Sequence, residues 1–136
     1  MNEIILKGKR VVKGNISGEA LVSNEPISFK QSIDASSGII VEKGHELEGI
    51  CITGKILIFP SGKGSTGGSF RLLEMARKHT LPKGIINLKS DPIIVAGAII
   101  VEIPMLDSVD PKIFDLIKSG DFITLDANRE IIKLIK

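Results

Sequence analysis

The sequence predicts a single α+β domain, in which a β-rich N-terminal half is followed by a C-terminal half that contains helices. The chain has 136 residues, of which 43% are hydrophobic. A chain of this size can form one domain that buries roughly two thirds of the surface of its unfolded state. Short apolar segments separated by glycines fill residues 1–60, whereas apolar residues recur at helical spacing over residues 70–76. No repeat, linker or low-complexity segment divides the chain, so the predicted domain spans residues 1–136.

The strands of the first half are predicted from short apolar runs bounded by glycines, a pattern typical of β-structure. These runs lie at residues 4–6, 20–22, 38–41 and 55–59.

The second half is predicted to alternate helices and strands. A helix should start near Thr66 and stop before Pro82 and Gly84, which cannot continue it. It should be followed by a strand at 84–88, a helix at 91–98, a strand at 102–106, a short helix at 112–118 and a hairpin formed by 122–125 and 130–135. Asp91 and Asp110 each precede a proline and are expected to cap the helices that follow.

Composition argues against several functional classes. The net charge is only +2 and the charges are scattered, and the chain has five Phe, no Trp and no Tyr, so we expect no nucleic-acid partner. No signal peptide and no run of about 18 apolar residues is found, so we expect no membrane association and a soluble, cytoplasmic protein. The only cysteine, Cys51, cannot by itself hold zinc or an iron–sulfur cluster.

The stretch PSGKGSTGGS at residues 60–69, here called the glycine loop, is the strongest indication of a functional site. It holds four glycines, three serines and a lysine, and it lies between a buried strand and the first turn of a helix. Unpaired N–H groups and the helix dipole at such a place favour an anion, and glycines let it approach the main chain. An anion-binding site is therefore one interpretation.

Two other interpretations of the glycine loop remain open on the residues alone. Gly62, Gly64 and Gly67 fit the dinucleotide pattern G-x-G-x-x-G, although no acidic residue follows about 20 positions later in a regular βαβ unit. A P-loop is excluded, because Ser or Thr follows neither Gly54-Lys55 nor Gly62-Lys63. The loop could also be a structural turn in which Ser65 or Thr66 only caps the helix.

Three motifs in order, FPSGKGSTGGS, INLKSDPIIVAGAIIVEIPMLD and IKSGDFITLDANREII, resemble the small subunits of the aconitase X family. This resemblance implies a swivelling β/β/α domain, equivalent to the mobile fourth domain of aconitase but encoded as a separate polypeptide. It also implies a large catalytic subunit as partner in a heterodimer. The partner would hold a 4Fe-4S iron–sulfur cluster, and Cys51 would be a small core residue.

The resemblance also implies site residues. The family's catalytic base is a serine at the end of G-x-G-S, which falls on Ser65; Ser61 and Ser69 are the alternatives within the loop. The neighbouring substrate- or anion-binding residues would be Gly62, Lys63, Gly64, Thr66 and Gly67. Many relatives have arginine in place of Lys63. Arg71, one helical turn further on, ranks below Lys63 as an anion ligand, and His45 and His79 are expected to have surface or helix-end roles.

The activity implied is that of a hydro-lyase. Archaeal members of the family dehydrate (R)-5-phosphomevalonate to trans-anhydromevalonate 5-phosphate in the mevalonate pathway of isoprenoid biosynthesis. A serine alkoxide would remove the proton next to the carboxylate while cluster iron assists the departing hydroxyl. The alternatives are a hydroxyproline dehydratase small subunit and a non-enzymatic anion-binding module, because a fold does not determine a function.

Overall fold

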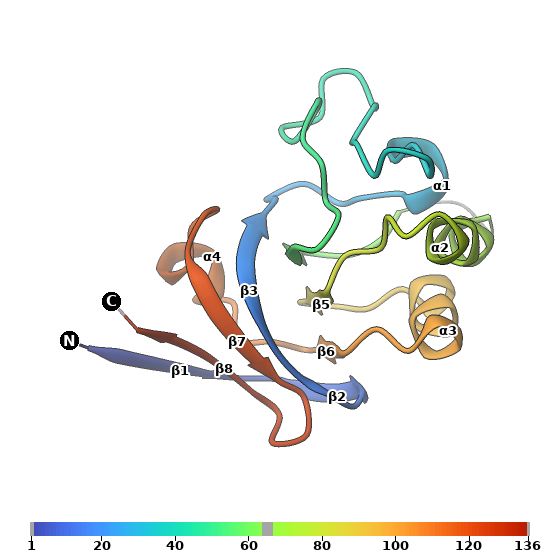
Figure 1. Cartoon of the computed structure of the whole chain (residues 1–136). Coiled ribbons are helices and arrows are strands. Elements are labelled where there is room, and N and C mark those ends of the chain that lie inside the picture. Colours follow the sequence, from blue (N-terminus) through green and yellow to red (C-terminus); the bar gives the residue numbers. More distant parts are fainter. Residues whose placement is uncertain (1, 64–66, 136) are drawn as a thin grey trace.

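The fold consists of a strongly curled sheet, with the helices of residues 29–32, 68–77 and 92–101 along one side and the short helix of residues 113–116 apart from them (Figure 1). The computed structural model describes residues 2–63 and 67–135. In chain order the elements are β1 (Glu3–Lys7), β2 (Lys9–Val12), β3 (Asn15–Val22), α1 (Phe29–Ser32), β4 (Ile56–Phe59), α2 (Gly68–Arg77), β5 (Gly84–Asn87), α3 (Pro92–Val101), β6 (Met105–Asp107), α4 (Ile113–Leu116), β7 (Phe122–Asp126) and β8 (Ile131–Ile135).

The strands follow the order β1-β8-β7-β3-β4-β5-β6-β2. Strands β3, β4, β5 and β6 are parallel, and all other pairs are antiparallel. β1 and β2 follow each other directly along the chain, with only Gly8 between them, yet they occupy the two ends of this order. The N-terminal segment therefore contacts both edges of the sheet and brings them together.

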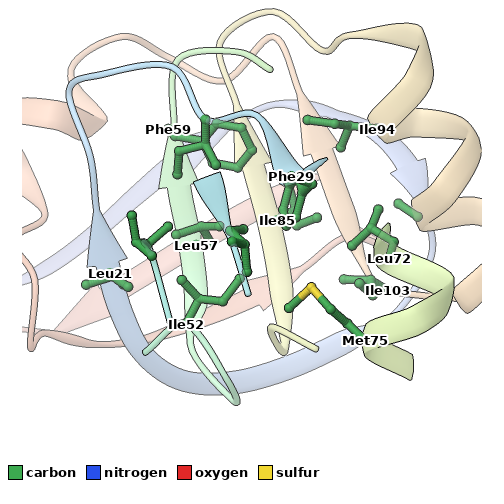
Figure 2. Packing of buried hydrophobic residues seen from close by; sticks show 14 of the residues in the cluster. Leu21, Phe29, Ile52, Leu57, Phe59, Leu72, Met75, Ile85, Ile94 and Ile103 are labelled. Atoms are coloured by element: carbon green, nitrogen blue, oxygen red, sulfur yellow. The ribbon is translucent and has the colours of Figure 1, made fainter. Parts of the chain in front are cut away.

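Two hydrophobic cores lie on opposite faces of the parallel strands. Leu57 and Phe59 of β4 point toward the helices, where Phe59 contacts Phe29 edge-on at a ring-centroid distance of 6.1 Å (Figure 2). Ile56 and Ile58 alternate to the other face and pack inside the curled sheet. A strand covered on both faces needs apolar residues at every position, which explains the continuous run ILIF in β4.

Most predicted elements of the second half are confirmed. α2, β5, α3, α4 and the β7–β8 hairpin lie where the sequence predicts them. The helix predicted to end at residue 98 continues to Val101, and the following strand is shorter than predicted because Glu102 ends α3 in the left-handed conformation, with φ 60°. Among the described helices, none is long and apolar enough to cross a membrane.

The first half differs more from the prediction. Residues 38–41 do not form a strand but make isolated bridges, in which Ile40 pairs with Ile33 and Ile39 with Cys51. Strand β2 and the short helix α1 were not predicted. The second half contains helices, as predicted, and within the described residues it also contributes strands β5 to β8 to the sheet.

Candidate functional site

The glycine loop lies at the carboxyl ends of the parallel strands, where ligands of open α/β sheets commonly bind. It begins directly after β4, and the carbonyl oxygen of Pro60 accepts hydrogen bonds from the N–H groups of Leu88 and Lys89, both at 3.1 Å. Leu88 and Lys89 follow β5. The segments that leave two neighbouring strands are therefore tied together at the start of the loop.

The first part of the loop is held in an extended conformation against the chain that enters α1. Ile27 forms a parallel bridge with Gly62: its N–H donates to the Ser61 carbonyl and its carbonyl accepts from the Lys63 N–H, each at 3.2 Å. On the other side, a Cβ atom at Gly62 would lie 2.5 Å from Ile94 Cδ1 and 3.1 Å from Asp91 Cβ. Gly62 is thus required by close packing against the start of α3.

The last part of the loop leads directly into α2. Gly67 is the N-cap residue, so the cap expected at Ser65 or Thr66 is found one or two positions later. The side chain of Lys30 crosses Gly67 so closely that a Cβ atom there would lie 2.2 Å from Lys30 Cδ. The loop is therefore packed against α1 at this end and against α3 at the other.

Ser61 and Ser69 are the two loop serines that lie within the described residues. Ser65, together with Gly64 and Thr66, lies outside the described residues. Ser69 Oγ donates a hydrogen bond of 2.7 Å to the Ile93 carbonyl, which gives this hydroxyl a structural role between α2 and α3. Ser61 instead lines a cavity of about 250 Å³ together with Gly62, Lys89, Ser90, Asp91 and Pro92.

Lys63 forms an ion pair that links the loop to a distant turn. Its Nζ lies 2.8 Å from Glu42 Oε2, and the other carboxylate oxygen of Glu42 accepts a short hydrogen bond from Ser32 Oγ. The hydrogen bond from Lys63, and then the one from Ser32, hold the pKa of Glu42 below its ordinary value. Lys63 therefore faces a permanent negative charge at neutral pH.

Two polar side chains fix the strand ends beneath the loop. Asn87 is fully buried at the end of β5, and its Nδ2 donates to the Phe59 carbonyl at 2.9 Å. Asp107 at the end of β6 accepts a hydrogen bond of 2.8 Å from the Ser90 N–H. Burial raises the pKa of Asp107, but the hydrogen bonds from Ser90 and Ser108 outweigh burial and hold this pKa below its ordinary value.

The other candidates have clear positions. Asp91 caps α3 as predicted, since its side chain accepts from the Ile93 N–H at 2.7 Å. His79 is exposed just beyond α2, as expected. Arg71 donates to the Ile33 carbonyl and lies 3.6 Å from Glu74, so its guanidinium is engaged at α1 and within α2.

The surface role expected for His45 is wrong. His45 is 5% exposed, its Nε2 lies 3.1 Å from the Pro26 carbonyl, and its Nδ1 accepts from the Leu47 N–H at 3.0 Å. The charged residues around it suggested an exposed turn, but the ring satisfies two backbone groups and is therefore buried. Cys51 is half-buried rather than in the core, and its Sγ donates to the Ser37 carbonyl at 3.4 Å.

Sequence reasoning missed the ion pair between Lys63 and Glu42 and the support that Ser32 gives to Glu42. Glu42 and Ser32 lie far from Lys63 along the chain, and no spacing rule connects an isolated glutamate to a lysine in a later loop.

The described residues do not fit an iron–sulfur cluster. Within residues 2–63 and 67–135, no three His, Cys, Asp or Glu side chains come close enough to hold a metal ion. Such a cluster is normally held by about four ligands, usually cysteines, and this chain has one cysteine.

Comparison with known proteins agrees with this geometry. The chain is 43% identical to the phosphomevalonate dehydratase small subunit of Methanosarcina acetivorans over 136 residues, which is 100% of this chain and 94% of the relative. It is 42% identical to the protein of the same name from Pyrococcus furiosus, covering 96% of this chain and 95% of that one. The crystal structure of holo aconitase X from Thermococcus kodakaraensis superposes with a TM-score of 0.92 at 37% identity, covering 98% of this chain and 99% of that chain. The family model for the aconitase X swivel domain matches residues 5–134, and the chain therefore belongs to the aconitase X swivel-domain family.

Proposed function

We propose that this chain is the small subunit of a hydro-lyase that dehydrates (R)-5-phosphomevalonate to trans-anhydromevalonate 5-phosphate in the cytoplasm. The similarity to the named relatives over nearly their whole length carries this proposal. The position of the glycine loop supports it, since the loop joins the carboxyl end of β4 to the N-terminus of α2. An anionic substrate is stabilised at such a place by backbone N–H groups and the helix dipole.

Ser65 is the proposed proton acceptor. It removes a proton from the carbon next to the carboxylate, the hydroxyl group leaves from carbon 3, and the two are lost as water. A serine hydroxyl is a weak base at neutral pH, so it requires a positive and dry environment. The start of α2 and the ammonium group of Lys63 are the positive groups of the described loop. Gly62, Gly64, Thr66 and Gly67 would shape the space for the substrate around Ser65.

The iron–sulfur cluster and the remaining catalytic groups belong, in this proposal, to a larger partner subunit. Two observations favour this arrangement: the described residues offer no metal site, and the relatives are named as small subunits. Phe70 would contact this partner beside the loop, since its large apolar side chain is 74% exposed in the first turn of α2. Residues 1–136 would then act as one swivelling domain that covers the partner's site.

Anaerobic co-expression with the large subunit encoded in the same genome tests the proposal. We expect the purified complex to contain iron and to dehydrate 5-phosphomevalonate, whereas this chain alone should contain no iron and have no activity. Turnover of 3-hydroxyproline instead of 5-phosphomevalonate would assign the other dehydratase activity. A chain that binds no large subunit and only small anions would be a binding module.

A further inference from the structure

We propose that Glu42 is a positioning residue for the catalytic loop, and that it acts by holding the side chain of Lys63 in place. This inference rests on the proposed function, because it takes Ser65 as the base. Lys63 stands two residues before Ser65, and its ammonium group is 2.8 Å from Glu42. The carboxylate of Glu42 thereby fixes the side chain that carries the positive charge nearest to Ser65 in the sequence.

Glu42 is itself held rigidly, as a positioning residue must be. Its second oxygen accepts from Ser32 Oγ, and Ser32 is fully buried at the end of α1. Ser32 is anchored by its N–H, which donates to the Ser28 carbonyl at 2.7 Å, and by its carbonyl, which accepts from the Val41 N–H at 2.6 Å. The carboxylate of Glu42 is therefore supported by a buried side chain whose own backbone is tied to Ser28 and to Val41, the residue before Glu42.

The turn that carries Glu42 is anchored to the same stretch that holds the loop. The N–H of buried His45 donates to the Glu42 carbonyl at 3.3 Å, and its ring contacts the Pro26 carbonyl at 3.1 Å. Ile27, the next residue, forms the bridge with Gly62. The segment Pro26–Ile27 thus aligns the loop in two ways. It bridges the loop backbone directly at Gly62, and it anchors the turn whose Glu42 holds Lys63.

The physical role of this ion pair is geometric rather than stabilising. The side chain of Lys63 is 41% exposed and that of Glu42 is 28% exposed, and pairs in such positions contribute little to the free energy of unfolding. Once a partner covers the loop and excludes water, the same two charges interact more strongly. Loss of Glu42 should consequently affect turnover much more than stability.

The experiment compares kcat and KM for Glu42→Gln, Lys63→Met and the double variant in the reconstituted complex. Glu42→Gln should lower kcat by about tenfold, because small errors in the placement of a reacting group are costly, and should leave KM within about twofold. The double variant should be no slower than the slower single variant, since the two residues act as one unit. Glu19→Gln is the matched control: Glu19 pairs with Lys55, also at 2.8 Å, at the opposite end of β4.

A full kcat for Glu42→Gln in an active complex would overturn the inference. Fully additive losses in the double variant would also overturn it, because Lys63 would then act independently. A complex without dehydratase activity would contradict the proposed function instead. In that case the backbone amide signals of Lys63 and Gly67 in the full chain decide: a shift in Glu42→Gln but not in Glu19→Gln supports the positioning role, and unchanged signals overturn it.

Discussion

At the level of single side chains, replacing Ser65 by alanine separates proton transfer from binding. If Ser65 accepts the proton, Ser65→Ala removes an interaction that is needed only in the transition state. We therefore expect kcat to fall by roughly 10² to 10⁴ while the affinity for 5-phosphomevalonate changes little. Steady-state kinetics and equilibrium binding on the reconstituted complex measure the two quantities.

Two other serines of the loop supply controls for this prediction. Ser61→Ala should leave kcat near the parent value. Ser69→Ala should lower the free energy of unfolding by about 1 kcal/mol, because it removes the hydrogen bond to the Ile93 carbonyl. Normal turnover of the Ser65 variant would exclude this residue from the mechanism.

Asp107 gives the strand ends beneath the loop a defined pH dependence. Its pKa is lower in the folded chain than the ordinary value of 3.8. Its contribution to the free energy of unfolding is therefore complete above the unfolded pKa and is lost as the pH falls through the folded one. Asp107→Asn should cost roughly 1 to 2 kcal/mol at neutral pH. Urea denaturation should show the stability difference between the parent and Asp107→Asn shrinking from neutral pH toward the lowest pH at which the chain stays folded. An equal difference at neutral and at low pH would contradict the role of Asp107.

At the level of elements, the close approach of α2 and α3 depends on Gly97. A Cβ atom there would lie 2.6 Å from Leu72 Cδ1 and 3.2 Å from the backbone Cα of Ser69. Alanine is normally favoured over glycine within a helix by about 1 kcal/mol. We expect Gly97→Ala to destabilise the chain nevertheless, by about 1 kcal/mol or more, because α2 must move away from α3.

Ala96, exposed on the same helix, calibrates that measurement. Ala96→Gly reports what the exchange of alanine and glycine costs in α3 without a neighbouring contact. Thermal melts of both variants give the comparison. If Gly97→Ala raised the melting temperature as much as Ala96→Gly lowered it, helix propensity alone would govern the site and the close contact would be unimportant.

The same elements illustrate how far the sequence predicts this fold. α3 has local signals at its start, Asp91 with Pro92, and β4 has an uninterrupted apolar run, so both were predictable. Residues 38–41 have the same apolar character as a strand, yet their bridges to Ile33 and Cys51 end after one pair each. β2 was not predicted because its sequence KRVV has only two apolar residues and so lacks the apolar run that marks the other strands. The contact between Glu42 and Lys63 was not predicted because it joins side chains 21 positions apart in the sequence. Whether Ser65 is the base stays a prediction.

At the scale of the whole molecule, Phe70 is expected to contribute to a partner interface. Since it is 74% exposed, Phe70→Ser should change the free energy of unfolding of this chain by no more than about 0.5 kcal/mol. The affinity of the Phe70→Ser variant for the large subunit should fall by roughly tenfold or more, as happens when apolar anchor residues are truncated in other interfaces. Titration calorimetry with the purified subunits measures this affinity.

Phe122 provides the matched control, since it is 69% exposed but lies opposite Glu19, near the start of β4 rather than its end. Phe122→Ser should leave the affinity unchanged. Equal losses for both phenylalanines would mean that the partner does not select the face beside the glycine loop.

The closure of the sheet by β1 has a consequence for the order of assembly. β1 pairs only with β8 within the described strands, in a register that sets Glu3 opposite Ile135. On the ribosome β1 emerges long before its partner, because domains are synthesised from the N-terminus at about 5 to 20 residues per second. The parallel strands and their helices can associate during this interval. β1 cannot yet pair, because its partner β8 (Ile131–Ile135) has not been synthesised. Closure of the sheet is therefore a late event that must follow the synthesis of β8.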